Sequence, residues 1–279
     1  MKRAWLPAGL LVFSGWASAQ PAPAPCGEVV TVEAQPGSTL RYALEPPSGT
    51  APPITLLLLP GGHGFVDLDA RGCARKLKGN SLVRSMPLFQ AAGFGTALVD
   101  APTGFQGEDG LGGYRVDARH AHDIGRVVAD VRTRTRGAVW VVGTSRGAIS
   151  AVNAASRLSG DAAPDGVVLS SSVVSGQPGA RKPWVAHSVF DLPLEHIHQP
   201  ILVLGHAADA CIRSPASLME RVAARTQGAR EQVVTVTGGP GGASLSSVDA
   251  CEGRSPHGFI EQEAEVAAGI ERFVRGGRY

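Results

Sequence analysis

A serine framed by glycines carries the clearest chemical signal in this 279-residue sequence. The segment Gly143-Thr144-Ser145-Arg146-Gly147 matches the G-x-S-x-G pattern, in which the serine stands on a sharp turn between a strand and a helix. Its flanks fit that setting, because residues 138–142 read as a short buried strand and 148–158 as a helix with an apolar stripe. We therefore predict that Ser145 is a nucleophile exposed at the end of a strand.

A serine hydroxyl is a good nucleophile only when a base takes its proton and an acid orients that base. Asp209 comes just after the apolar run 201–205, at the expected end of a strand. Of the eight histidines, His257 alone follows Asp209 in the sequence, and the order serine, acid, histidine suits this motif. We predict Asp209 as the acid and His257 as the base, with Asp191 and Asp249 as rival acids.

A glycine-rich loop follows the continuous apolar run 54–59 and reads Pro60-Gly61-Gly62-His63-Gly64. Two backbone N–H groups must face the negative charge that develops when a carbonyl is attacked. Arg146 is expected to supply one, and either Gly62 or His63 the other. The loop has neither the G-x-G-x-x-G pattern nor the lysine of a phosphate-binding loop, so no nucleotide cofactor is expected.

The N-terminus has the features of an export signal. Met1-Lys2-Arg3 is positive, the run 4–16 is mostly apolar, and Ala17-Ser18-Ala19 resembles a cleavage site. We predict a signal peptide over 1–19 and a Pro/Ala-rich lead-in over 20–27, and therefore a periplasmic or secreted protein. The apolar run is too short for a permanent membrane anchor, although an uncleaved anchor is the alternative.

Composition narrows the range of partners. Without Lys2 and Arg3 the chain has 24 basic and 24 acidic residues, a balance that argues against nucleic acid or an anionic membrane as partner. The expected partner is a small molecule, and the expected assembly is a monomer or a small homo-oligomer.

The four cysteines suit two disulfide bonds in an exported protein. Three connectivities are possible, and the pairs Cys26–Cys73 and Cys211–Cys251 keep each bond within one part of the chain. A zinc site is the rival interpretation, but no Cys-x-x-Cys or His-x-x-x-His spacing supports it. No metal is expected.

The elements that must position these residues alternate between strand and helix. Two strands rich in Val, Thr and Tyr come first and read as a hairpin-like start. The predicted strands are 28–34, 39–45, 54–59, 94–99, 138–142, 166–171, 201–205 and 232–236. The predicted helices are 81–92, 117–135, 148–158, 214–226 and 259–275. This alternation predicts one domain over 28–279, of the α/β class, with a doubly wound, mainly parallel sheet and helices on both faces. The stretch 172–199 lacks periodicity and is expected to be a short cap at most, or a long loop.

Over nearly its whole mature length the sequence resembles the α/β-hydrolase family, and within it the compact secreted esterases. The matching segments are 56–64, 143–147, 202–209 and 256–259. The resemblance implies metal-free hydrolysis of carboxylic esters through an acyl-enzyme on Ser145, with His257 as acid and base and Asp209 orienting it. Peptide or amide hydrolysis by the same triad, and an inactive binding protein, are the alternatives.

Three further expectations concern the surroundings of Ser145. If the loops that carry Asp209 and His257 converge on the nucleophile, Cys211 and Cys251 should be close enough to bond and to fix the acid relative to the base. The side chain of Arg146 is unusual beside a nucleophile, and we expect it to brace neighbouring loops rather than bind substrate. The pocket is expected to include Phe65, Phe105, Tyr114 and Trp184, with the substrate itself left open.

Overall fold

The computed structural model describes Met1 and residues 25–49, 53–243 and 245–279. The predicted signal peptide after Met1, and the lead-in up to residue 24, lie outside the described residues. Within the described part of the chain, no helix is both long and apolar enough to cross a membrane.

The described residues form an eight-stranded sheet with the order β1-β2-β4-β3-β5-β6-β7-β8. The strands are Glu28–Glu33 (β1), Thr39–Glu45 (β2), Ile54–Leu59 (β3), Gly95–Val99 (β4), Ala138–Thr144 (β5), Gly166–Ser170 (β6), Ile201–His206 (β7) and Glu231–Val236 (β8). β2 pairs antiparallel with β1 and with β4. All the other pairs are parallel, so the mainly parallel sheet predicted from the sequence is correct.

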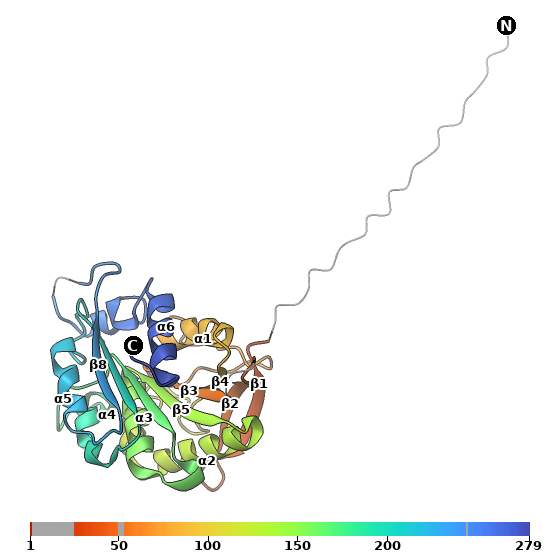
Figure 1. Cartoon of the computed structure of the whole chain (residues 1–279), viewed down its shortest axis with the longest axis horizontal. Helices are drawn as coiled ribbons and strands as arrows, with labels where there is room; N and C mark the ends of the chain where they lie inside the picture. Colours follow the sequence, from red (N-terminus) through yellow and green to blue (C-terminus); the bar gives the residue numbers. More distant parts are fainter. Residues whose placement is uncertain (2–24, 50–52, 244) are drawn as a thin grey trace.

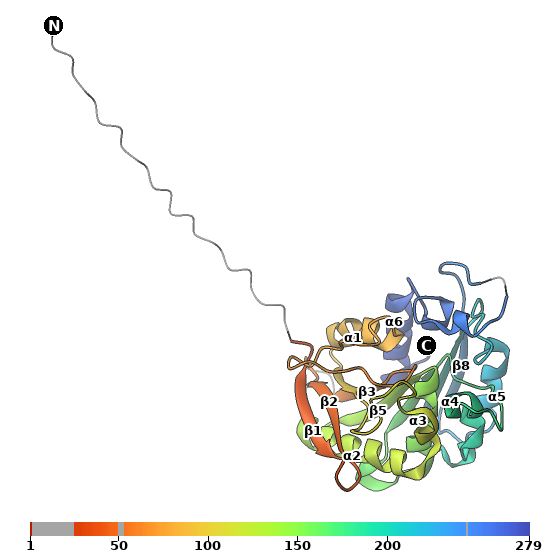
Figure 2. The same cartoon turned by 180° about the vertical axis from the view of Figure 1, so that it is seen from behind.

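Helices cover both faces of this sheet (Figures 1 and 2). The helices are Ser81–Ala91 (α1), Ala118–Thr135 (α2), Arg146–Arg157 (α3), Pro183–Ala186 (α4), Met219–Ala223 (α5) and Glu263–Val274 (α6). Apolar residues of α1 and α6 pack on one face, and those of α2, α3 and α5 pack on the other. The architecture is therefore three-layered and doubly wound.

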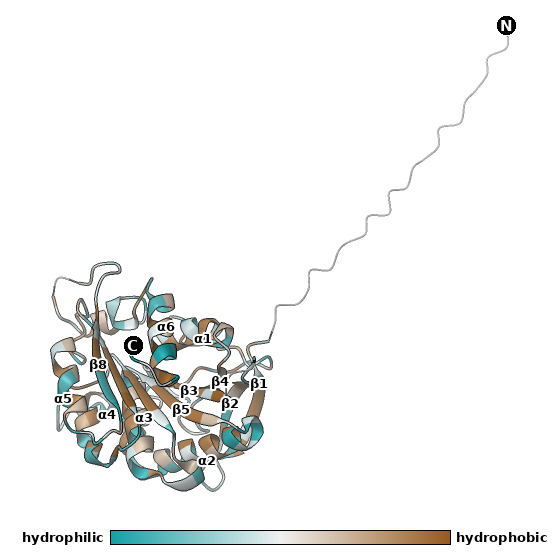
Figure 3. Ribbon diagram, viewed as in Figure 1, coloured by the Kyte–Doolittle hydropathy of each residue, from teal (hydrophilic) through white to brown (hydrophobic). Residues whose placement is uncertain are grey.

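The central strands are apolar on both sides because both of their faces are covered. In β3, Leu57 and Leu59 belong to the core beneath α2 and α3, whereas Leu56 and Leu58 belong to the core beneath α1 and α6. Figure 3 shows the resulting band of hydrophobic strands through the middle of the molecule. A sheet held from both faces provides a rigid support for the loops at its carboxyl edge.

Two predicted helices were too long. The helix expected over 259–275 begins only at Glu263, because Phe259 and Glu261 have positive φ angles of 54° and 61° that a right-handed helix does not accommodate. The helix expected over 214–226 is reduced to α5 and one preceding 3₁₀ turn. The first error lies just after His257 and the second begins at Ser214. At both places the backbone is irregular where a helix was predicted.

The aperiodic stretch 172–199 contains the single-turn helix α4 and short 3₁₀ turns. It crosses the carboxyl side of the sheet, where Trp184 lines a pocket together with Ser145. This segment therefore forms a short cap, as one of the two interpretations of the sequence proposed.

Candidate active site

Ser145 occupies a strained turn between β5 and α3. Its φ and ψ angles are 52° and −125°, a conformation that non-glycine residues rarely adopt. The flanking glycines make the turn sterically feasible. A Cβ on Gly143 would lie 2.5 Å from the carbonyl oxygen of Gly147, and a Cβ on Gly147 would lie 1.9 Å from that of Leu59. The turn therefore holds Ser145 at the N-terminus of α3, where the helix dipole favours negative charge.

Asp209 and His257 meet beside this turn although 48 residues separate them in sequence. Nδ1 of His257 lies 2.9 Å from Oδ2 of Asp209, a distance that suits a hydrogen bond from Nδ1–H to the carboxylate. The other carboxylate oxygen of Asp209 accepts a hydrogen bond of 2.8 Å from the backbone N–H of Cys211. In a neutral imidazole, the tautomer with its proton on Nδ1 has its lone pair on Nε2.

Ser214 completes this cluster, and the sequence reasoning did not identify it. Its fully buried hydroxyl donates to Oδ2 of Asp209 at 3.0 Å and lies 2.9 Å from Nδ1 of His257. The hydroxyl thus contacts both partners and restrains the imidazole ring. The only feature of the sequence that could have pointed to Ser214 is its position five residues after Asp209.

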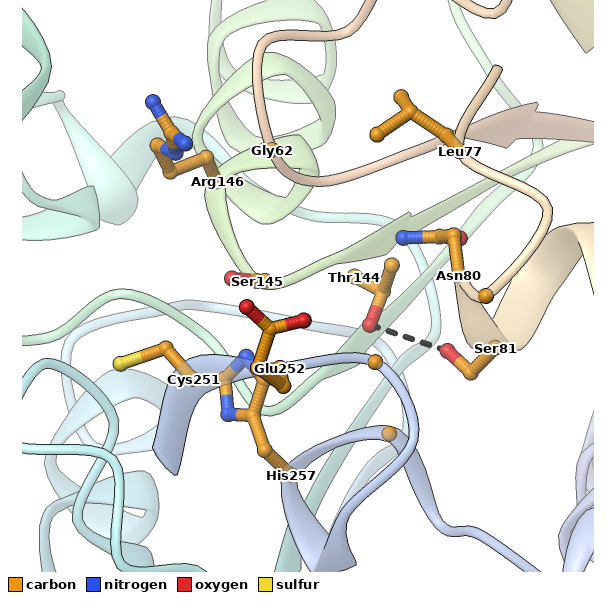
Figure 4. A pocket seen from close by; sticks show the side chains of 13 residues that line it. Gly62, Leu77, Asn80, Ser81, Thr144, Ser145, Arg146, Cys251, Glu252 and His257 are labelled. Atoms are coloured by element: carbon orange, nitrogen blue, oxygen red, sulfur yellow. Dashed lines mark hydrogen bonds between the residues drawn. The ribbon is translucent and has the colours of Figure 1, made fainter. Parts of the chain in front are cut away.

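Nε2 of His257 is buried and has no hydrogen-bond partner among the described residues. His257 and Ser145 line the same pocket, of about 310 Å³, together with Gly62, Asn80 and other residues. Ser145 and His257 reach the lining of this pocket from different parts of the chain, and in the view of Figure 4 the side chain of Glu252 is drawn between them. A base for the serine proton needs an imidazole nitrogen that no other group occupies, and Nε2 of His257 meets this condition among the described residues.

The loop 60–64, termed the oxyanion loop below after its predicted role, packs directly against Ser145. A Cβ on Gly61 would lie 2.8 Å from Cβ of Ser145, so a larger residue there would displace the loop. Gly62 lines the pocket with Ser145 and Arg146, and Nδ1 of His63 accepts a hydrogen bond of 3.1 Å from the N–H of Phe65. The choice between the backbone N–H groups of Gly62 and His63 as oxyanion donor stays a prediction.

Arg115 holds the oxyanion loop from beneath, and no sequence motif pointed to it. The guanidinium is 1% exposed and donates to the carbonyl oxygen of Pro60 at 3.0 Å and to Oγ of Ser150 at 2.6 Å. Ser150 also lies 2.8 Å from Nε2 of His120. Among the described residues Arg115 has no carboxylate partner, and burial, with a smaller effect of the Arg146 charge, lowers its pKa to about 9. A buried positive charge therefore lies under the loop that faces the nucleophile.

The rival acids occupy other positions. The carboxylate of Asp191 accepts a hydrogen bond of 2.7 Å from the backbone N–H of Ser188, and Asp249 is exposed at the rim of the pocket beside Trp184.

Of the four aromatic residues expected in the pocket, only one lines it among the described residues. Trp184 lines the pocket, but the other three pack with Leu111 in a small cluster of their own, namely Phe65, Phe105 and Tyr114.

Both cysteine pairs favoured from the sequence are bonded in the structure, Cys26–Cys73 and Cys211–Cys251. The second bond joins the segment after Asp209 to the segment before His257, and both its cysteines line the pocket beside Trp184. Donor atoms of Asp209, Cys211 and His257 lie within 4.8 Å of one another. The Cys211 sulfur is already bonded to Cys251, however, so no thiolate is left there to bind a metal.

Several solved structures share this architecture, and some of them are named as hydrolases. One is an alpha-beta serine hydrolase homologue from Coxiella burnetii, at TM-score 0.58 and 13% identity, covering 91% of this chain and 100% of that one. Another is a dienelactone hydrolase from Anabaena variabilis, at TM-score 0.58 and 18% identity, covering 91% and 99%. A third is Est1E from Butyrivibrio proteoclasticus, at TM-score 0.57 and 12% identity, covering 89% and 98%.

The chain has the α/β-hydrolase fold. No protein-family model matches the sequence, and no curated protein matches it either. At these identities the structural likeness defines the fold alone, so the chemistry has to be argued from the residues at the site. In an α/β hydrolase the strand-to-helix turn after β5 and the loops at the carboxyl edge of the sheet are where such residues gather.

Proposed function

We propose that this α/β-hydrolase-fold protein is a serine hydrolase that cleaves carboxylic esters of small molecules through an acyl-enzyme on Ser145. The observation that carries the proposal is the orientation of His257. Its Nδ1 contacts Asp209 and its Nε2 has no hydrogen-bond partner among the described residues, while His257 and Ser145 line the same pocket. The names of the structural neighbours, among them a serine hydrolase homologue and a dienelactone hydrolase, support the same reaction class.

The proposed reaction uses only side chains and backbone of this chain. Oγ of Ser145 attacks the ester carbonyl while Nε2 of His257 takes its proton. The N–H groups of Gly62 and Arg146 donate to the carbonyl oxygen as it becomes negative. His257 then returns the proton to the alcohol as the ester C–O bond breaks, which leaves an acyl group on Ser145.

Water completes the cycle. Nε2 of His257 takes a proton from a water molecule, which attacks the acyl carbonyl and forms a second tetrahedral intermediate. Collapse of that intermediate releases the carboxylic acid and returns the proton to Ser145. Asp209 stabilises the imidazolium that forms in each half of the reaction, and Ser214 holds both partners in place.

The proposed location is the periplasm or the cell exterior. Two disulfide bonds fit an oxidising compartment, and the predicted signal peptide over 1–19 would provide the route.

The test combines active-site labelling with turnover. Purified protein should react with a fluorophosphonate probe and hydrolyse 4-nitrophenyl acetate, and Ser145→Ala should lose both properties while keeping its thermal transition. Ser159→Ala, at an exposed serine just beyond the other end of α3, is the matched control and should behave as wild type. Folded wild-type protein that is neither labelled nor active would favour a binding protein. Wild-type-like turnover by Ser145→Ala would contradict the mechanism.

A further inference from the structure

The guanidinium of Arg146 has no ion-pair partner in the part of the chain that the structure describes. It is half-buried and lies over the ring of Trp184, with 4.8 Å between the guanidinium carbon and the ring centroid. Among the described residues it forms neither an ion pair nor a side-chain hydrogen bond. In Figure 4 the Arg146 side chain and Asn80 lie on opposite sides of Ser145. Arg146 thus places a cation against an aromatic ring of the segment 172–199, next to Ser145 in the sequence. The bracing role expected for this side chain stays a prediction.

A second arginine lines the same pocket. Arg213, on the segment between Asp209 and Ser214, is 8% exposed. Its guanidinium donates to the backbone carbonyl oxygens of Ser175 and His187, and no carboxylate within the described ranges pairs with it. This pocket, of about 240 Å³, is distinct from the pocket of about 310 Å³ that His257 lines, but the two share Gly62, Ser145 and Arg146. A molecule bound there can contact both cations and the nucleophile.

Burial disfavours the charged form of both arginines, and the charge of Arg213 adds to this effect at Arg146. Burial, with the charge of Arg213 as the second cause, lowers the pKa of Arg146 to about 10, and burial also lowers the pKa of Arg213. The acids nearby do not neutralise them. Asp249 and Glu252 line the pocket but are exposed, and Asp109, whose charge favours the charged form of Arg146, is ion-paired with Lys182 at 3.2 Å.

We infer that the substrate is an ester that carries an ionised carboxylate, which binds between Arg146 and Arg213 while Ser145 attacks the ester carbonyl. This inference rests on the proposed ester hydrolysis and specifies its substrate class. A carboxylate accepts paired hydrogen bonds from a guanidinium, and it would relieve the repulsion between the two cations. Trp184 provides an apolar surface for the carbon chain between the carboxylate and the ester.

The experiment compares charged esters with their uncharged methyl esters. One pair places the charge in the acyl part, mono-4-nitrophenyl adipate and its methyl ester. The other places it in the alcohol part, 4-acetoxybenzoate and its methyl ester. Rates of spontaneous hydrolysis are measured with Ser145→Ala and subtracted. For each pair the readout is the ratio of kcat/KM for the charged ester to kcat/KM for the neutral one.

Wild type should prefer the charged ester in at least one pair by about tenfold or more, the size expected for hydrogen bonds to a charged group. Arg146→Gln and Arg213→Gln should bring that ratio close to one, and the corresponding lysine variants should keep part of it. Arg157→Gln, at the opposite end of α3, is the matched control and should keep the full ratio. Added sodium chloride should lower the wild-type ratio through screening, a measurement that does not depend on whether any variant folds.

Two results would separate the possible failures. If Ser145 is labelled and neutral esters are hydrolysed, but neither pair shows a preference or the glutamine variants leave the preference unchanged, the carboxylate inference is wrong and ester hydrolysis stands. If neither charged nor neutral esters are hydrolysed and Ser145 is not labelled, the proposed function fails, and the inference fails with it.

Discussion

The two disulfide bonds allow the contribution of Cys211–Cys251 to catalysis to be separated from its contribution to stability. The perturbation is the double variant Cys211→Ala/Cys251→Ala, with Cys26→Ala/Cys73→Ala as its control. The sequence separations are 40 and 47 residues. In the chain-entropy model each bond therefore stabilises the folded state by about 4 kcal/mol. Either variant should lower Tm by about 10 °C.

The two variants should differ in activity because only one of the bonds lies at the site. Cys211 follows Asp209 closely and its N–H donates to that carboxylate, while Cys251 precedes His257 on the other loop. Without the bond, the loops that carry acid and base are no longer joined, so we expect kcat/KM to fall by about tenfold or more, equivalent to ~1.4 kcal/mol of transition-state stabilisation. The control bond joins the N-terminal segment to the loop that follows the oxyanion loop, and its loss should leave kcat within about twofold of wild type.

The assay is ester hydrolysis at a temperature where both variants remain folded, checked by circular dichroism, together with urea unfolding of the same preparations. Two results would refute the reasoning. In one, the two variants lose activity equally, which would make activity a mere reflection of stability. In the other, Cys211→Ala/Cys251→Ala keeps full activity despite its lower free energy of unfolding, which would mean that hydrogen bonds alone position the acid and the base.

Three further perturbations test the supporting residues. Ser214→Ala removes the hydroxyl that donates to Asp209 at 3.0 Å; kcat/KM should fall by about tenfold with KM little changed, measured by steady-state kinetics, and wild-type kcat would show that the hydroxyl is dispensable. Arg115→Met removes the donor to the carbonyl of Pro60, and kcat should fall by about tenfold or more. The free energy of unfolding should change little, because the variant also removes a buried charge that has no carboxylate partner among the described residues. A fall in kcat that is accompanied by an equally large loss of unfolding free energy would contradict this. Burial, with the Arg115 charge as a second cause, lowers the pKa of His120 to about 3, so between about pH 6.5 and 3 the unfolded chain binds a proton that the folded chain does not. Stability from this group is present above that range and is lost as pH falls through it; unfolding titrations of His120→Gln should show a flatter acid limb than wild type, and identical limbs would exclude this role.

Local sequence information was enough for the strands, the nucleophile turn and the class of fold. A strand buried on both faces must be apolar throughout, which makes Ile54–Leu59 and Ala138–Thr144 recognisable without knowledge of their neighbours. The turn at Ser145 is recognisable because its backbone angles and its close packing require glycines at fixed distances on either side. These constraints act between residues that are close in sequence, so they can be recognised from the amino-acid sequence alone.

Tertiary structure decided the features that depend on groups distant in sequence. The bond from Arg115 to Pro60 spans 55 residues and follows no spacing rule. The position of Ser214 between Asp209 and His257 depends on where two loops converge. The late start of α6 follows from the positive φ of Phe259, whose ring is buried in the core.

Arg146 and Arg213, which form no ion pair among the described residues, belong to the same class, because whether an arginine has a charged partner depends on every chain segment around it. Sequence patterns therefore indicated the chemistry of Ser145. The contacts that orient its partners, and the charge of the pocket in front of it, arise from packing of segments far apart in the chain.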